Sequence, residues 1–109
     1  MLENLLGNKT LEKILLSAER YGQVYATGLS KTFNIPVYSV QKQLAKMESS
    51  GVLVSRLFGK VRLYEFNPRY PLLNELKTLL RKTFDFLPEQ DIKKHYMKRQ
   101  RPRLAGKPL

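Results

Sequence analysis

The sequence contains no cysteine and only one histidine, His95, among its 109 residues. Disulfides, thiolate metal sites and cysteine nucleophiles are therefore excluded, and a structural metal site would lack ligands. No apolar run approaches the ~20 residues that span a bilayer, and the chain opens with Met1-Leu2-Glu3 rather than with a basic signal region. These absences predict a cytoplasmic protein with no metal, no cofactor and no membrane partner.

Patterns typical of catalysis are also scarce. His95 lies in a basic stretch, and no serine or carboxylate pattern around it indicates a nucleophile or a proton relay. The acidic residues are scattered along the chain, and Gly51 and Gly59 each fit a turn rather than a phosphate-binding loop. We therefore expect that the chain is not an enzyme.

Positive charge is what the sequence has in excess. It contains 20 lysines and arginines against 9 acidic residues, which gives a formal net charge of +11. Such a balance favours a polyanionic partner, either a nucleic acid or an anionic membrane surface. Apolar residues make up 42% of the chain, which is enough for the core of one small domain.

Residues 26–53 predict a helix, a tight turn and a second helix, because apolar residues recur at helical spacing on both sides of the turn. Asn34 can adopt the positive φ that a turn requires, and Pro36 suits the first turn of a helix. The second helix is expected to present polar and cationic side chains that suit base edges and phosphates: Tyr38, Ser39, Gln41, Lys42, Gln43 and Lys46. A plain helical hairpin with a solvated face remains the alternative at this point.

Two β-forming runs, 52–58 and 61–66, follow directly and are separated by Gly59-Lys60. Both runs are rich in β-branched and aromatic residues, the second alternates cleanly, and a short glycine-containing turn separates them, which predicts a β-hairpin. Arg56, Lys60 and Arg62 lie on or beside its tip. A helix-turn-helix followed by a basic hairpin is a winged helix-turn-helix.

The N-terminal part predicts a scaffold for these elements. Residues 2–22 form a short lead-in and a helix, with Asn8 or Thr10 as its N-cap. Gly22 ends this helix, and residues 23–25 could add a short third strand to the wing.

Sequence motifs occur in a characteristic order between residues 8 and 80. The helix-turn-helix is followed by Leu44-x-x-Met47-Glu48-x-x-Gly51-Val52-Leu53, by the wing, and by Tyr64-x-Phe66-Asn67-Pro68. In this pattern the chain resembles the winged-helix transcriptional regulators of the ArsR-like (arsenical-repressor-like) type. It departs from them at Pro36, where a capping serine or threonine is common, and it lacks the Cys and His ligands of the metal-sensing members. The expected fold is α+β, a winged helix-turn-helix with a two- or three-stranded antiparallel wing.

The charge and the resemblance together predict a dimeric, sequence-specific regulator of transcription that binds double-stranded DNA. Bases would be read by Val37, Tyr38, Ser39, Gln41, Lys42 and Gln43, phosphates held by Lys31 and Lys46, and the minor groove flanked by Arg56, Lys60 and Arg62. The alternative is a protein-interaction module, such as the antitoxin or adaptor half of a two-gene pair, which would bind a protein partner.

A broad apolar stripe over residues 72–87 predicts a C-terminal helix after the breaker at 67–71. Because the stripe is wide for so small a domain, we expect it to form a homodimer interface through Leu72, Leu73, Leu76, Leu79, Leu80 and Phe84. In the alternative, the helix folds back on Leu11 and Ile14 as part of the core.

The C-terminal end changes composition, with seven lysines and arginines in residues 93–109 and no acid after Asp91. Pro102, Gly106 and Pro108 interrupt this stretch, so it predicts a mobile basic arm. We therefore expect one domain over residues 1–90 and a basic tail over residues 91–109. A passive, solubilising tail is the alternative.

Overall fold

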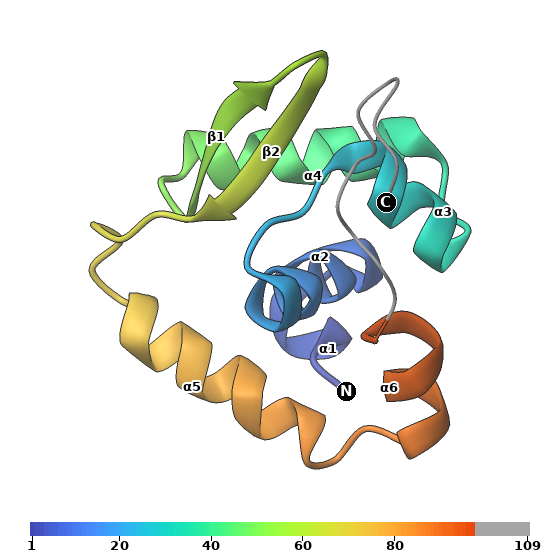
Figure 1. The fold of residues 1–109 in the computed structure, drawn as a ribbon. Coiled ribbons are helices and arrows are strands. Elements are labelled where there is room, and N and C mark those ends of the chain that lie inside the picture. Colours follow the sequence, from blue (N-terminus) through green and yellow to red (C-terminus); the bar gives the residue numbers. More distant parts are fainter. Residues whose placement is uncertain (98–109) are drawn as a thin grey trace.

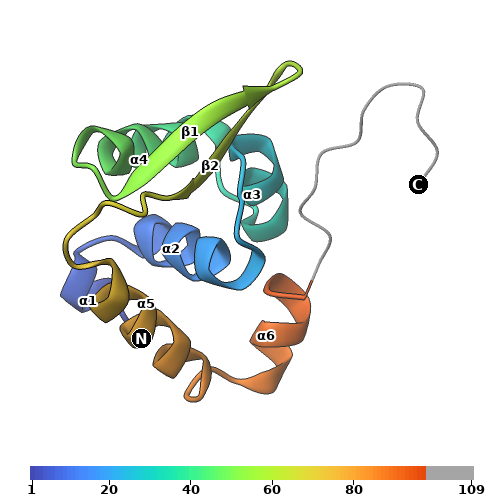
Figure 2. The same ribbon diagram turned by 60° about the vertical axis from the view of Figure 1, so that its left-hand side comes forward.

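A computed structural model describes residues 1–97 and shows a small α+β domain arranged around one central helix. Its elements are α1 (Glu3–Leu6), α2 (Lys9–Tyr21), α3 (Ala26–Phe33), α4 (Val37–Ser49), β1 (Leu53–Phe58), β2 (Val61–Phe66), α5 (Leu73–Phe84) and α6 (Glu89–His95). Helix α2 lies in the middle, with α4 and the β1–β2 hairpin on one side and α5 and α6 on the other (Figures 1 and 2).

Local signals fix both ends of α2. The side chain of Asn8 accepts a hydrogen bond from the Leu11 amide at 2.8 Å, so Asn8 is the N-cap. Gly22 ends the helix in a backbone conformation with a φ of 83°. Between them Ile14, Leu15 and other apolar residues of α2 are buried in the core. The predicted scaffold helix is therefore confirmed.

The wing is a two-stranded antiparallel hairpin in which Leu53 faces Phe66 and Phe58 faces Val61. The third strand that the sequence allowed is reduced to one bridge between Val24 and Tyr64. The Val24 amide donates to the Tyr64 carbonyl at 2.9 Å, and the Tyr64 amide donates back at 2.8 Å. This bridge fastens β2 to the segment between α2 and α3.

Gly51 and Asn67 hold the base of the wing to the end of α4. Gly51 has a φ of 84°, and the next amide, of Val52, donates to the Met47 carbonyl at 3.0 Å. The Asn67 side chain donates to the Gly51 carbonyl at 3.0 Å. Gly51 therefore forms the turn that follows α4, as the sequence predicted, and Asn67 ties the end of β2 to the same corner.

Helix α5 packs on α2, which corrects part of the predicted dimer interface. Leu80 is completely buried, and Leu76 and Phe84 pack against the core. These three residues recur every four positions and so share the face toward α2. The assignment of Leu80 to dimerisation was therefore wrong, and Leu76 and Phe84 also face the core, because the stripe supplies the domain's own core first. Of the six predicted residues, Leu72 and Leu79 are exposed and Leu73 is half-buried.

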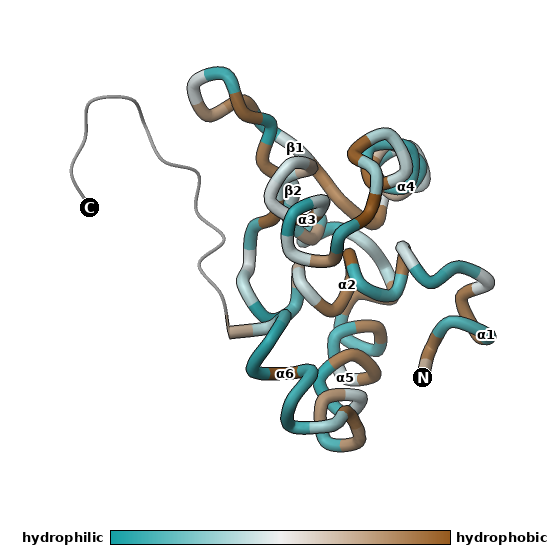
Figure 3. Tube along the Cα trace, turned by 90° about the vertical axis from the view of Figure 1, so that its right-hand side faces the viewer, coloured by the Kyte–Doolittle hydropathy of each residue, from teal (hydrophilic) through white to brown (hydrophobic). Residues whose placement is uncertain are grey.

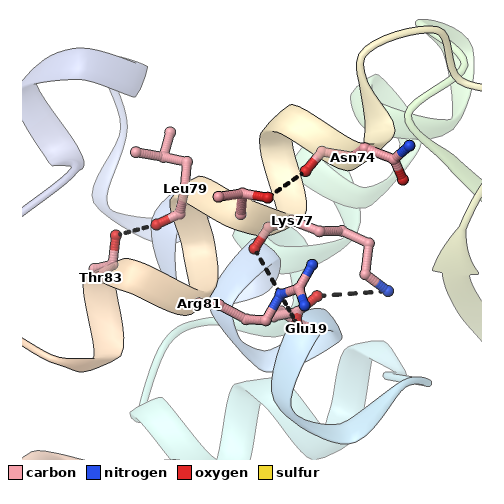
Figure 4. A network of polar contacts seen from close by, with 7 residues as sticks. Glu19, Asn74, Lys77, Leu79, Arg81 and Thr83 are labelled. Carbon is pink, nitrogen blue, oxygen red and sulfur yellow. Dashed lines mark hydrogen bonds and ion pairs between the residues drawn. The ribbon is translucent and has the colours of Figure 1, made fainter.

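Ion pairs reinforce the packing of α5 on α2, as Figure 4 shows. The Glu19 carboxylate of α2 lies 3.6 Å from Lys77 Nζ and 3.4 Å from Arg81 Nε, and its side chain is only 10% exposed. The Arg81 Nε also donates to the Lys77 carbonyl at 3.3 Å. One carboxylate therefore pairs with two cations of α5 and adds to the contact between this helix and α2.

Helix α6 and Tyr96 correct the predicted boundary at residue 90. The Tyr96 ring is buried, with centroid distances of 5.6 Å to Phe33 and 5.1 Å to Phe84. Arg20 Nε donates to the Tyr96 carbonyl at 2.9 Å, and the Tyr21 hydroxyl donates to the His95 carbonyl at 2.8 Å. Residues 91–97 therefore belong to the domain. The rest of the predicted tail, 98–109, lies outside the described residues.

Candidate nucleic-acid interface

The turn between α3 and α4 sets the direction of the candidate recognition helix. Asn34 has a φ of 55°, as its position in the sequence predicted. The Ser30 hydroxyl donates to the Ile35 carbonyl at 2.5 Å, and the Ile35 amide donates to the Ser30 carbonyl at 3.1 Å. Both hydrogen bonds close the turn, so α4 leaves it at a fixed angle to α3.

Pro36 is the N-cap of α4, and among residues 1–97 no side chain caps the helix. Its φ of −54° is compatible with helix entry, and its carbonyl accepts from the Ser39 amide at 3.0 Å. Val40 and Leu44 then bury one face of α4 in the core. The opposite face begins at the first residue of the helix and is open to solvent.

Exposed side chains on α4 include most of those predicted to read DNA. Tyr38 is 72% exposed and Val37 is 38% exposed, at the N-terminal end of the helix. Gln41, Lys42 and Lys46 are exposed further along it, and Ser39 is half-buried. Lys31, at the end of α3, is also exposed. These residues form one polar and cationic surface that can meet a groove and its phosphates.

Gln43 does not belong to this surface, which corrects its assignment as a base-reading residue. It is only 9% exposed. It lies three positions after Val40 and next to Leu44, so the helical repeat places it on the buried face. The polarity of Gln43 favoured an outward position, but the helical repeat determines the direction in which its side chain points.

The hairpin exposes Arg56, Lys60 and Arg62 to solvent, and Arg62 is in addition held by a neighbouring side chain. Arg62 Nη1 donates to the Ser55 hydroxyl at 3.0 Å. That hydroxyl in turn donates to Glu48 Oε2 at 2.5 Å. These contacts link the wing to the end of α4. The sequence did not predict them, because the three residues belong to three different elements.

Two residues of this link, Glu48 and Arg62, also affect the pKa of the Tyr64 phenol. Burial raises the pKa of the Tyr64 phenol and the Glu48 carboxylate raises it further, while Arg62 acts in the opposite direction. The phenol therefore stays neutral in the ordinary pH range. Tyr64 is a structural part of the wing base.

Charge is unevenly distributed between the two sides of the domain. Residues 26–66, which form α3, α4 and the hairpin, contain six lysines and arginines but only two carboxylates, Glu48 and Glu65. Glu48 is engaged by Ser55, and Glu65 is half-buried. The solvent-facing surface of these elements is therefore predominantly positive.

Residues 1–97 offer no cluster of three or more His, Asp or Glu side chains that could hold a metal ion. In the same part of the chain, no helix is both long and apolar enough to cross a membrane.

Comparisons with known proteins identify the fold. No family model matches the chain, and no curated protein matches it in sequence. The crystal structure of YusO protein from Bacillus subtilis is similar over 85% of this chain and 74% of that chain, with 15% identity and a TM-score of 0.58. The crystal structure of the adhesin competence repressor from Streptococcus pyogenes is similar over 84% of both chains, with 18% identity and a TM-score of 0.56. The α+β winged-helix fold predicted from the sequence is confirmed.

Proposed function

We propose that this protein is a DNA-binding transcriptional regulator that places α4 in the major groove and its wing on the flanking backbone or minor groove. One observation carries the proposal: α4 and the basic hairpin lie on the same side of α2 (Figures 1 and 2), and the exposed side chains of α4 are mostly polar or charged. A helix fits the major groove, and a hairpin beside it reaches the neighbouring phosphates. That one similar structure is named a repressor supports a role in transcription.

Each predicted residue that is exposed or half-buried has a role in this proposal. Val37, Tyr38, Ser39, Gln41 and Lys42 contact base edges, and Lys31 and Lys46 hold phosphates. Arg56 and Lys60 contact the backbone beside the wing. Arg62, which is held by Ser55, offers its remaining donors to a phosphate at a fixed position. The ArsR-like subtype of the sequence resemblance stays a prediction.

Dimerisation completes the proposal because two copies related by a two-fold axis would present two α4 helices to successive major grooves. The remaining exposed apolar residues of α5, Leu72 and Leu79, and the half-buried Leu73 are the positions available for this contact. Leu79 also lines a shallow depression with Asn74, Glu75 and Thr78. The second copy would cover this face of α5.

Binding-site selection from random duplexes, followed by gel-shift titration, tests the function. We expect the full chain to enrich one sequence, and Gln41→Ala to weaken binding to it by roughly 1–3 kcal/mol while binding to shuffled DNA changes little. Gln90→Ala, an exposed glutamine on α6, is the matched control and should behave as the wild type. Failure to enrich any sequence, or equal losses on both duplexes, would contradict the proposal.

A further inference from the structure

Two large apolar side chains are exposed at the tip of the wing. Leu57 is 63% exposed and Phe58 is 37% exposed. They are the last two residues of β1 and come directly before the Gly59-Lys60 turn. In the sequence they only indicated a strand, but within residues 1–97 both side chains are open to solvent.

The register of the hairpin determines where these side chains lie. Leu57 is opposite Arg62, and Phe58 is opposite Val61, so the two pairs occupy opposite faces of the hairpin. Gly59 has a φ of 63°, which allows the turn to be completed in two residues and keeps the tip narrow. The apolar tip is therefore thin and has apolar side chains on both faces.

Cations surround this apolar tip. Arg56 and Lys60 are exposed on either side of the pair in sequence, and Arg62 lies directly across from Leu57. Because Ser55 holds Arg62, the charge beside Leu57 is oriented in advance. Figure 3 shows apolar and polar segments meeting at the hairpin tip, which projects from the body of the domain.

Scattered exposed apolar residues are normal on a protein surface. Here, however, two adjacent apolar residues project from a narrow tip, and both strands carry an exposed arginine beside them, Arg56 on β1 and Arg62 on β2. Charge complementarity points to a polyanion as the occupant, and apolar side chains that enter the minor groove act as wedges between base pairs.

We propose that Leu57 and Phe58 form an apolar wedge that enters the DNA minor groove, partly unstacks one base step and bends the duplex, while Arg56, Lys60 and Arg62 hold the phosphates on either side. This inference rests on the proposed DNA-binding function and adds a deformation that α4 alone would not cause. Pyrimidine–purine steps unstack most easily. The wing would therefore favour such a step beside the major groove that α4 contacts, without reading base edges.

The test uses the full chain and the duplex obtained by binding-site selection. A 2-aminopurine base at the flanking step reports unstacking by its fluorescence, and dyes at the two duplex ends report bending by energy transfer. Anisotropy measures binding in the same samples. The wild type should raise the 2-aminopurine fluorescence and bend the duplex within the range of about 20–90° known for apolar wedges.

Leu57→Ser and Phe58→Ser are compared with Leu5→Ser, a control at a residue of α1 that is 70% exposed. Each wing variant should still form the complex, with roughly tenfold lower affinity, but with a smaller bend and weaker fluorescence than the wild type. Leu5→Ser should match the wild type. Circular dichroism and thermal unfolding are measured as well, and all three variants should fold.

The outcomes separate the two proposals. A saturated complex without unstacking or bending would overturn the wedge and leave the DNA-binding function intact, as would wing variants that bend DNA like the wild type. If Leu57→Ser instead lowered the mass of the free protein in solution, the tip would be a protein contact and the wedge would be wrong. Absence of a complex on every duplex at low salt would overturn the proposed function and the wedge together.

Discussion

The Ser30 hydroxyl donates a hydrogen bond to the Ile35 carbonyl at 2.5 Å, across the turn that joins α3 to α4. The backbone of the same two residues is also paired, at 3.1 Å. Between them Asn34 has the left-handed conformation that reverses the chain. The Ser30 side chain therefore adds a second hydrogen bond to the backbone pair that closes the turn of the helix-turn-helix.

Ser30→Ala removes this contact and leaves the Ile35 carbonyl with one partner fewer. The free energy of unfolding should fall by about 1 kcal/mol, the usual effect of losing one partly buried hydrogen bond. Urea denaturation followed by circular dichroism measures it. Ser49→Ala, at an exposed position near the end of α4, should leave the unfolding midpoint nearly unchanged. A Ser30 variant as stable as the wild type would show that the backbone pair alone closes the turn.

Gln43→Ala should act on stability rather than on DNA recognition, because this side chain is nearly buried. Truncation leaves a small gap beside Leu44, and we expect a loss of about 1 kcal/mol in the free energy of unfolding. The ratio of affinities for the selected and shuffled duplexes should not change, in contrast to Gln41→Ala. A changed ratio with unchanged stability would return Gln43 to the base-reading set.

Some features of the fold and the site could be predicted from the sequence, and others could not. Asn34, Gly51 and Gly59 were predictable because each backbone conformation there needs a particular residue type. Gln43 was not, because polarity alone was taken to mean exposure. Leu80 was misassigned for a related reason, since the width of an apolar stripe does not say how much of it another helix of the same chain covers.

Helix α6 was missed because of its charge. Residues 93–109 were interpreted as a basic arm from their lysines and arginines, while Ile92 and Tyr96, four positions apart, form the small apolar face that packs on the core. Two apolar residues in a charged stretch are a weak signal. The sequence does not show that Phe33 and Phe84, which are distant in the chain, lie together and pack against the Tyr96 ring.

Residues 72 and 79 should control assembly, whereas residue 80 should control folding. A double variant with Leu72→Glu and Leu79→Glu places charges on the exposed face of α5 and should give folded monomers. Leu80→Ala should instead lower the free energy of unfolding by roughly 2–5 kcal/mol, as for other buried leucines. Sedimentation velocity and thermal unfolding distinguish these results. A folded double variant with the mass of the wild-type dimer would move the interface elsewhere.

Alkaline pH should destabilise the protein through Tyr96. Burial raises the pKa of its phenol above the ordinary value of 10.0, and Glu12, Asp91 and Tyr21 add to the rise. Above pH 10.0 the unfolded chain loses this proton while the folded protein keeps it, so stability is full below that pH and falls as the pH rises toward the folded pKa.

Tyr96→Phe keeps the ring and removes the titrating group. The variant should therefore lose less stability than the wild type between about pH 9 and pH 11. Tyr38→Phe, at the exposed N-terminal end of α4, is the control and should follow the wild type. Urea unfolding at a series of pH values gives the comparison. Parallel pH curves for all three proteins would mean that the Tyr96 phenol ionises in the folded state as readily as in the unfolded chain.

The central claim, that α4 and the wing form a sequence-reading DNA interface, is tested most directly by one anisotropy titration series. The full chain is titrated with the selected duplex and with its shuffled version at several salt concentrations. Because each neutralised phosphate adds about 0.9 to the slope of log affinity against log salt, both duplexes should show steep negative slopes. The selected duplex should bind at least about 10³-fold more tightly at physiological salt. Equal affinities for the two duplexes, or affinities that do not change with salt, would contradict the account.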